Sequence, residues 1–243
     1  MSSRRITALS HAPLKGIALV LVAVIIFASM DTAGKYLMTK FNVPLVAAVR
    51  YGLNLLILTA LMAPKHGAAL WKTQRTKLVW LRGASLALAT FFAGLALQRL
   101  PVGEAVSIFY LQGFGVMLAA GYVLKEKVSL AGWFAAIFGF AGVVLIARPG
   151  GSLDALGVLF AFICSAVSVI YILLSRVLAT TESTMAMLFY VALSGSILFG
   201  VMLLFDWQNF SYTTLDMALL FYIGAASLLA HFLLTSAYRF APA

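Results

Sequence analysis

Residues 82–150 read RGASLALATFFAGLALQRLPVGEAVSIFYLQGFGVMLAAGYVLKEKVSLAGWFAAIFGFAGVVLIARPG. Apolar runs of about 20 residues alternate in this stretch with short polar turns. A helix rises about 1.5 Å per residue, so a run of about 20 residues crosses the ~30 Å hydrocarbon core of a bilayer. Backbone groups in lipid must find their hydrogen bonds internally, which makes helix the structure expected of such runs. The stretch therefore predicts consecutive membrane-spanning helices.

The same pattern extends over the whole sequence of 243 residues, of which 63% are hydrophobic and 10% are charged. A soluble domain is nearer half apolar and a quarter charged, so this composition excludes an ordinary soluble fold. We predict an all-α membrane protein with eight transmembrane helices. Their expected ranges are 16–36, 43–63, 79–98, 102–124, 129–147, 156–175, 185–205 and 218–238.

The basic residues, which give a net charge of +10, fall mainly on alternate loops between these spans. Excess Lys and Arg mark the cytoplasmic side of a membrane protein. The charges thus predict a multi-pass protein of the bacterial inner (plasma) membrane with a cytoplasmic N-terminus, rather than a nucleic-acid-binding protein. The segments expected on the inner side hold Arg4, Arg5, Lys15, Lys65, Lys72, Arg75, Lys77, Arg82, Lys125, Lys127, Arg176 and Arg239. Those expected outside hold Lys35, Lys40, Arg99 and Arg148.

An internal repeat emerges when the sequence is shifted by 141 residues, which places Gly83 on Gly224 and Pro101 on Pro242. The repeat unit has five helices, an odd number, so the second copy enters the membrane in the opposite direction. Inverted repeats of this kind are typical of secondary transporters. We predict a first repeat at 1–150 and a second, inverted and incomplete repeat of three helices at 151–243. The sequence would then belong to a ten-helix fold truncated after the eighth helix.

Residues 82–150 also resemble the EamA family of the drug/metabolite transporter superfamily. The likeness lies in the Arg-Gly opening, the aromatic mid-helix, the LPVGEA turn, the Lys-Glu-Lys loop and the Gly-rich helix that ends Ala-Arg-Pro. The resemblance implies two inverted five-helix halves with a substrate held centrally. It also implies an amino acid, a vitamin or a nucleoside-like compound as substrate. The segment SMDTAGKYL at 29–37 is similar to members that carry S-adenosylmethionine or riboflavin.

Two charged residues stand out because they lie well inside predicted spans, Asp31 in the first and Arg50 in the second. A charge there costs roughly 2.5–3.5 kcal/mol on insertion scales and needs a reason. The two spans form a hairpin that places both residues at similar depth, so we expect them to pair. Such a pair either ties the hairpin together or serves in substrate binding or gating.

Uncharged polar residues supply the other candidates. His231 lies mid-span on one helix face with Ser227 and Thr235, and its repeat partner is Thr90. Both faces are expected to line a central cavity. The Gln112 amide either joins helices or contacts substrate. Phe91, Phe92, Phe109 and Tyr110 either line an aromatic pocket or pack. The remaining candidates for substrate binding or gating are Asn54, Tyr171, Tyr190 and Ser194.

These features predict a secondary transporter that moves a small organic metabolite by alternating access. Its partners would be the small-molecule substrate and the lipid bilayer. A homodimer is a further possibility that the sequence does not decide. No P-loop, dinucleotide fingerprint or Cys/His metal spacing is present, so we expect no enzyme activity, no cofactor and no metal. Two alternatives are a non-catalytic membrane scaffold subunit and a membrane-embedded enzyme.

Overall fold

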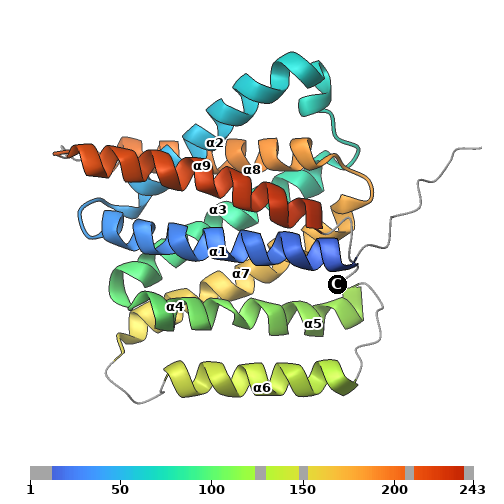
Figure 1. The fold of residues 1–243 in the computed structure, drawn as a ribbon, viewed down its shortest axis with the longest axis vertical. Helices are drawn as coiled ribbons and strands as arrows, with labels where there is room; N and C mark the ends of the chain where they lie inside the picture. Colours follow the sequence, from blue (N-terminus) through green and yellow to red (C-terminus); the bar gives the residue numbers. More distant parts are fainter. Residues whose placement is uncertain (1–12, 124–129, 148–152, 206–210, 238–243) are drawn as a thin grey trace, which may run out of the picture.

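The computed structural model describes residues 13–123, 130–147, 153–205 and 211–237. Helices dominate these ranges and are arranged roughly side by side (Figure 1). The expectation of an all-α fold is confirmed. The elements are α1 (Pro13–Met38), α2 (Val43–His66), the 3₁₀ turn η1 (Gly67–Leu70), α3 (Thr76–Arg99), α4 (Val102–Phe109), α5 (Leu111–Val123), α6 (Leu130–Ala147), α7 (Ala155–Ala179), α8 (Thr184–Phe205) and α9 (Thr214–Ala237).

Seven stretches in the described ranges are long and apolar enough to cross a membrane, and a shorter apolar stretch lies within α6. The predicted spans therefore correspond to helices, with one correction. The fourth span is not one continuous helix, because α4 ends at Phe109 and α5 begins at Leu111. Tyr110 stands at this break and donates its backbone N–H to the Val106 carbonyl at 3.1 Å.

The starts of α2 and α7 are fixed by short polar side chains that accept hydrogen bonds from otherwise unpaired backbone N–H groups. The Asn42 side chain accepts from Leu45 N at 3.1 Å at the start of α2. The Asp154 carboxylate accepts from Gly157 N at 2.7 Å at the start of α7. This hydrogen bond is the main reason why the pKa of Asp154 lies below its ordinary value of 3.8.

The contacts between helices come in pairs that are related by the 141-residue shift. The shift carries α1, α2 and α3 onto α7, α8 and α9. Helix α3 packs on α7 as α9 packs on α1, α3 packs on α8 as α9 packs on α2, and α2 packs on α8. An inverted repeat predicts this pattern, because a twofold operation maps each contact onto its partner.

Two repeat-related glycines allow the equivalent helices to approach closely. A Cβ atom on Gly83 of α3 would lie 2.5 Å from the Ser194 Oγ of α8. One on Gly224 of α9 would lie 2.8 Å from the Leu53 Cβ of α2. The small residue at each position lets the backbones meet, as is common between membrane helices.

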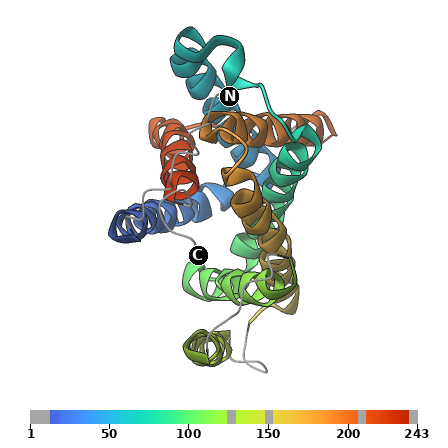
Figure 2. The same ribbon diagram turned by 90° about the vertical axis from the view of Figure 1, so that its right-hand side faces the viewer.

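Helices α4, α5 and α6 form the margin of the bundle (Figure 2). α6 packs on α4 and α5 and lies away from the other helices. Its outward side chains are large and apolar, with Phe138 76% exposed and Leu145 75% exposed. In a multi-pass membrane protein this face belongs to the lipid-facing surface.

Candidate functional site

A cavity of about 310 Å³ lies among the helices and is lined by both predicted repeats. A smaller hollow of about 80 Å³ shares part of its wall. The predicted site residues that line the larger cavity are Asp31, Arg50, Thr90, Gln112, Tyr171 and His231. The structure therefore brings together side chains from α1, α2, α3, α5, α7 and α9.

The break at Tyr110 lies in this cavity wall, where Phe109, Tyr110 and Gln112 all contribute to the lining. The expected aromatic pocket thus forms only in part. Phe91 and Phe92 are not among the residues that line either hollow. Their rings instead contact each other edge-on, with centroids 5.6 Å apart.

Arg50 is held against α3 and does not pair with Asp31. Its Nη2 donates to the Thr90 Oγ1 at 2.8 Å, and its guanidinium lies 4.7 Å from the centre of the Tyr51 ring. No ion pair joins Arg50 to Asp31 in the described part of the chain. The expectation of an Asp31–Arg50 pair was therefore wrong, because Thr90 and Tyr51 draw the guanidinium away.

His231 is buried in the wall formed by α9. Its Nδ1 lies 3.4 Å from the Tyr171 hydroxyl, and its ring meets Phe27 edge-on at 5.0 Å. Ser227, one turn earlier, contacts the Asn54 amide at 3.3 Å instead. The two side chains therefore have different partners and do not form a nucleophile–base pair.

Arg82 is the main residue that the sequence interpretation misplaced. It was counted among the charges at the inner membrane surface, but its side chain lies within the bundle with no exposed surface. Its Nε donates to the Ser175 Oγ at 2.7 Å and its Nη1 to the Met187 carbonyl at 3.0 Å. Its Nη2 donates to the Tyr171 hydroxyl at 3.1 Å and to the Thr235 Oγ1 at 3.3 Å. Arg82 thus joins α3 to α7, α8 and α9.

Four predicted site residues lie outside the cavity lining. Thr235 accepts from Arg82, so the polar face of α9 does not line the cavity along its whole length. The Asn54 amide, turned so that both its ends are satisfied, donates to the Gly224 carbonyl at 2.6 Å and joins α2 to α9. The Tyr190 hydroxyl donates to the Trp71 carbonyl at 3.2 Å, and Ser194 packs at Gly83. These residues connect helices.

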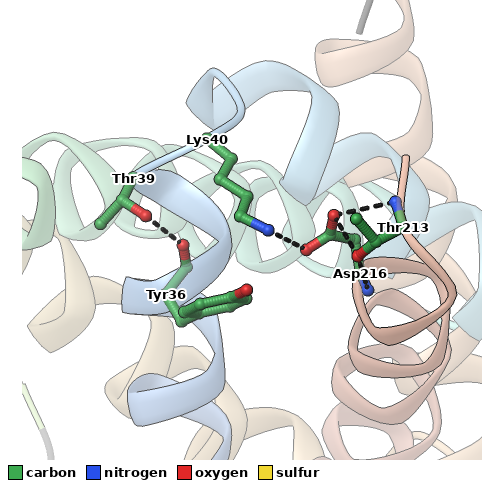
Figure 3. Close-up of polar contacts among 5 residues, drawn as sticks. All are labelled: Tyr36, Thr39, Lys40, Thr213 and Asp216. Carbon is green, nitrogen blue, oxygen red and sulfur yellow. Dashed lines mark hydrogen bonds and ion pairs between the residues drawn. The ribbon is translucent and has the colours of Figure 1, made fainter. Parts of the chain in front are cut away.

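One end of the bundle is closed by exposed or half-exposed ion pairs, and we call it the Lys40 end. The Lys40 Nζ lies 2.9 Å from the Asp216 Oδ1, and the same carboxylate accepts from the Thr213 hydroxyl and backbone N–H (Figure 3). Hydrogen bonds to Tyr36 and then to Asp216 raise the pKa of Lys40 above 10.5.

Two further contacts close the Lys40 end. Arg99 pairs with Asp154 at 3.2 Å, and both side chains are exposed. Lys35, counted above among the charges on the outer side, donates to the carbonyls of Leu97 and Leu100 at the end of α3. These contacts hold the start of α7 and the end of α1 against α3.

The opposite end, which we call the Arg82 end, is closed by Arg82 and by Glu182. The buried Glu182 carboxylate accepts from the backbone N–H groups of Gln74 at 3.0 Å and Arg75 at 2.7 Å. These donors precede α3, whose start has no cap from its own side chain. The residues that line the cavity therefore belong to helices that polar contacts join by different means at the two ends of the bundle.

Helices long and apolar enough to cross a membrane define a class, the multi-pass membrane proteins, and here they surround a cavity that could hold a small molecule. The sequence model of the EamA-like transporter family matches residues 14–148, more than half of the chain. The chain belongs to the EamA-like transporter family. The resemblance seen in the sequence is thereby confirmed.

Characterised relatives are similar over most of the chain. An S-adenosylmethionine uptake transporter of Rickettsia bellii (strain RML369-C) is 26% identical over 92% of this chain and 76% of its own length. A riboflavin transporter of Vibrio cholerae serotype O1 is 25% identical over 97% of this chain and 80% of its own length. A solved protein structure superposes with a TM-score of 0.73 at 20% identity, covering 92% of this chain and 79% of that one. That structure supports the fold.

Proposed function

We propose that the chain is a secondary transporter that moves a small organic metabolite by alternating access. The observation that carries the proposal is the cavity of about 310 Å³, lined by side chains of both predicted repeats. Secondary transporters place their substrate between inverted repeats, near the middle of the membrane.

The relatives support the substrate class. One is named as a transporter of S-adenosylmethionine, which contains an amino acid and a nucleoside, and another as a transporter of a vitamin. The cavity volume lies at the lower end of the range for small-molecule sites, which suits a single metabolite. We therefore infer an amino acid, a vitamin or a nucleoside-like compound as the substrate.

The two ends supply the elements that alternating access requires. The Lys40 end would open by separation of Lys40 from Asp216 and of Lys35 from the end of α3. The Arg82 end would open by separation of Arg82 from its acceptors on α7, α8 and α9. Rocking of one repeat against the other breaks one set while the other set stays closed.

A cavity-filling substitution tests the proposal. Ala93 lines both hollows, so Ala93→Phe places a ring inside the substrate space. Leu88→Phe is the matched control, because Leu88 is an exposed residue of the same helix. We expect the chain in liposomes to exchange labelled S-adenosylmethionine, riboflavin or an amino acid, and Ala93→Phe alone to abolish that exchange. Equal exchange by both variants would contradict the proposal.

The same measurement separates the alternatives. A scaffold subunit would give no exchange above protein-free liposomes and would tolerate substitutions in the cavity wall. A membrane-embedded enzyme would convert the added compound without moving it. The separate partners of Ser227 and His231 give the enzyme interpretation no support.

A further inference from the structure

We propose that the central cavity selects a zwitterionic metabolite, whose carboxylate binds at Arg50 and whose cationic group binds at Asp31. The inference rests on the proposed transport function, since it names the substrate class of that same cavity. It starts from two charges that the fold brings to one space and leaves without full partners.

Asp31 and Arg50 line both hollows, so they lie where the two join. Within the ranges that the structure describes, the Asp31 carboxylate accepts no hydrogen bond and joins no ion pair. Arg50 uses Nη2 on Thr90, but its Nε is buried and has no hydrogen-bond partner there. An unpaired charge inside a membrane protein is costly, so each side chain gains from a complementary group.

The arrangement favours a ligand that carries both charges. Asp31 stands on α1 and Arg50 on α2, beyond ion-pair distance from each other. A simple anion would satisfy Arg50 and leave Asp31 unpaired, and a simple cation would do the reverse. A carboxylate suits the open donor of a guanidinium especially well, because the bond is charge-assisted. An α-amino-acid group supplies a carboxylate and an ammonium together.

The rest of the cavity suits a flat, apolar or cationic body attached to that group. Phe27, Phe109 and Tyr110 all line the wall. Aromatic faces stack on planar rings and attract cations. Riboflavin offers a planar ring but neither a carboxylate nor a cation. Asp31 and Arg50 therefore favour a solute of the S-adenosylmethionine type over a neutral flavin.

Equilibrium binding to the purified full chain in detergent tests the inference with matched probes. S-adenosylmethionine is compared with methylthioadenosine, which lacks the amino-acid group, and L-tryptophan is compared with tryptamine, which lacks the carboxylate. Riboflavin is the neutral planar probe. We expect at least one zwitterion to bind about tenfold or more tightly than its counterpart and than riboflavin. If neither zwitterion is preferred, the inference is overturned.

Substitutions then locate the preference. Arg50→Gln and Asp31→Asn should each weaken binding of the preferred zwitterion about ten- to hundredfold. A substitution should not change the affinity for a counterpart that lacks the group bound by the substituted residue. Arg50→Lys and Asp31→Glu should recover part of the affinity, and they keep the test open if the neutral variants fold poorly. The matched controls are Arg99→Gln and Asp154→Asn, an exposed pair outside the cavity lining. Losses equal to those of the controls would overturn the inference.

The binding assay also separates this inference from the transport proposal. Charge-dependent binding without exchange in liposomes would contradict transport and support the zwitterion site. Exchange of riboflavin or another neutral solute that persists in Arg50→Gln and Asp31→Asn, with no zwitterion preferred, would support transport and overturn the zwitterion site.

Discussion

The two ends of the bundle are closed by opposite kinds of polar contact. At the Lys40 end, ion pairs join side chains that are 37–43% exposed, apart from the buried Asp216. At the Arg82 end, a guanidinium with no exposed surface meets acceptors on three neighbouring helices. Exposed ion pairs contribute little and are screened by salt, whereas removal of a buried hydrogen-bonded charge leaves several groups unsatisfied. The Arg82 end is therefore the more costly one to open.

The largest effect is expected from Arg82→Met. The change leaves the Ser175 and Thr235 hydroxyls and the Met187 carbonyl without their donor. We expect a loss of about 3 kcal/mol of stability, seen as a Tm lower by about 6–12 °C in detergent. Arg82→Lys should recover only part, since an ammonium does not reproduce the fork of donors. The exposed Lys77→Met, on the same helix, is the control. Equal Tm values for the two Met variants would contradict the conclusion that the Arg82 end is the more costly one to open.

A smaller effect is expected from Gly83→Ala, next to Arg82. The new Cβ would lie 2.8 Å from the backbone oxygen of Tyr190, which cannot rotate away. Overpacking of this kind costs about 1–3 kcal/mol. At the repeat partner, Gly224→Ala, the new Cβ would lie 2.8 Å from the Leu53 Cβ, which the backbone also fixes, so we expect a cost in the same range. Gly103→Ala, where nothing lies within 4 Å, is the control, and thermal unfolding ranks the three. An unchanged Tm for Gly83→Ala would mean that α3 and α8 separate freely.

Glu182→Gln should have an effect of about 1 kcal/mol. From the turn between α7 and α8, the carboxylate accepts from two backbone N–H groups that precede α3, and an amide offers one neutral oxygen in its place. Hydrogen exchange of Gln74 and Arg75 should rise, because their amides lose a charged acceptor. Glu104→Gln, in the first turn of α4, is a suitable control. Unchanged exchange at both amides would show that Glu182 does not hold this end.

Lys40→Gln should have the smallest effect, a Tm decrease of no more than about 2 °C that high salt removes. The pKa of Lys40 is raised in the folded protein, so its contribution is complete below pH 10.5 and is lost as the pH rises through the folded value. The Tm difference between wild type and Lys40→Gln should therefore shrink above about pH 10.5. A Tm decrease as large as that of Arg82→Met would contradict the conclusion that the contacts at the Lys40 end contribute less stability.

The helices were predictable because hydropathy over about 20 residues reports membrane spans directly. The predicted repeat places Gly83 on Gly224, and the structure shows a close approach of helices at both positions. The break at Tyr110 carried no signal, since the fourth span contains no proline after Pro101. Its position in the cavity wall depends on neighbouring helices.

The sequence indicated which polar residues lie inside the membrane spans, but it did not indicate which side chains they contact. Asp31, Arg50 and His231 stood out as polar groups inside spans, and all three line the cavity. Whether Arg50 contacts Asp31 or Thr90 depends on how α3 packs against α2, and the sequence alone does not give that packing. Arg82 stood only a few residues inside its predicted span of 79–98, where a basic residue ordinarily reaches toward water. Its acceptors lie 89 or more positions away in the chain.

The Tyr171 hydroxyl belongs to the cavity wall and to the Arg82 network at once, since it lies 3.1 Å from Arg82 Nη2 and 3.4 Å from His231 Nδ1. A solute that hydrogen-bonds this hydroxyl competes with Arg82 for one oxygen atom. Occupancy of the cavity and closure of the Arg82 end are then thermodynamically linked, and the linkage is reciprocal. Under the proposed transport function, a single phenol group would thus link occupancy of the cavity to the contacts of the Arg82 end.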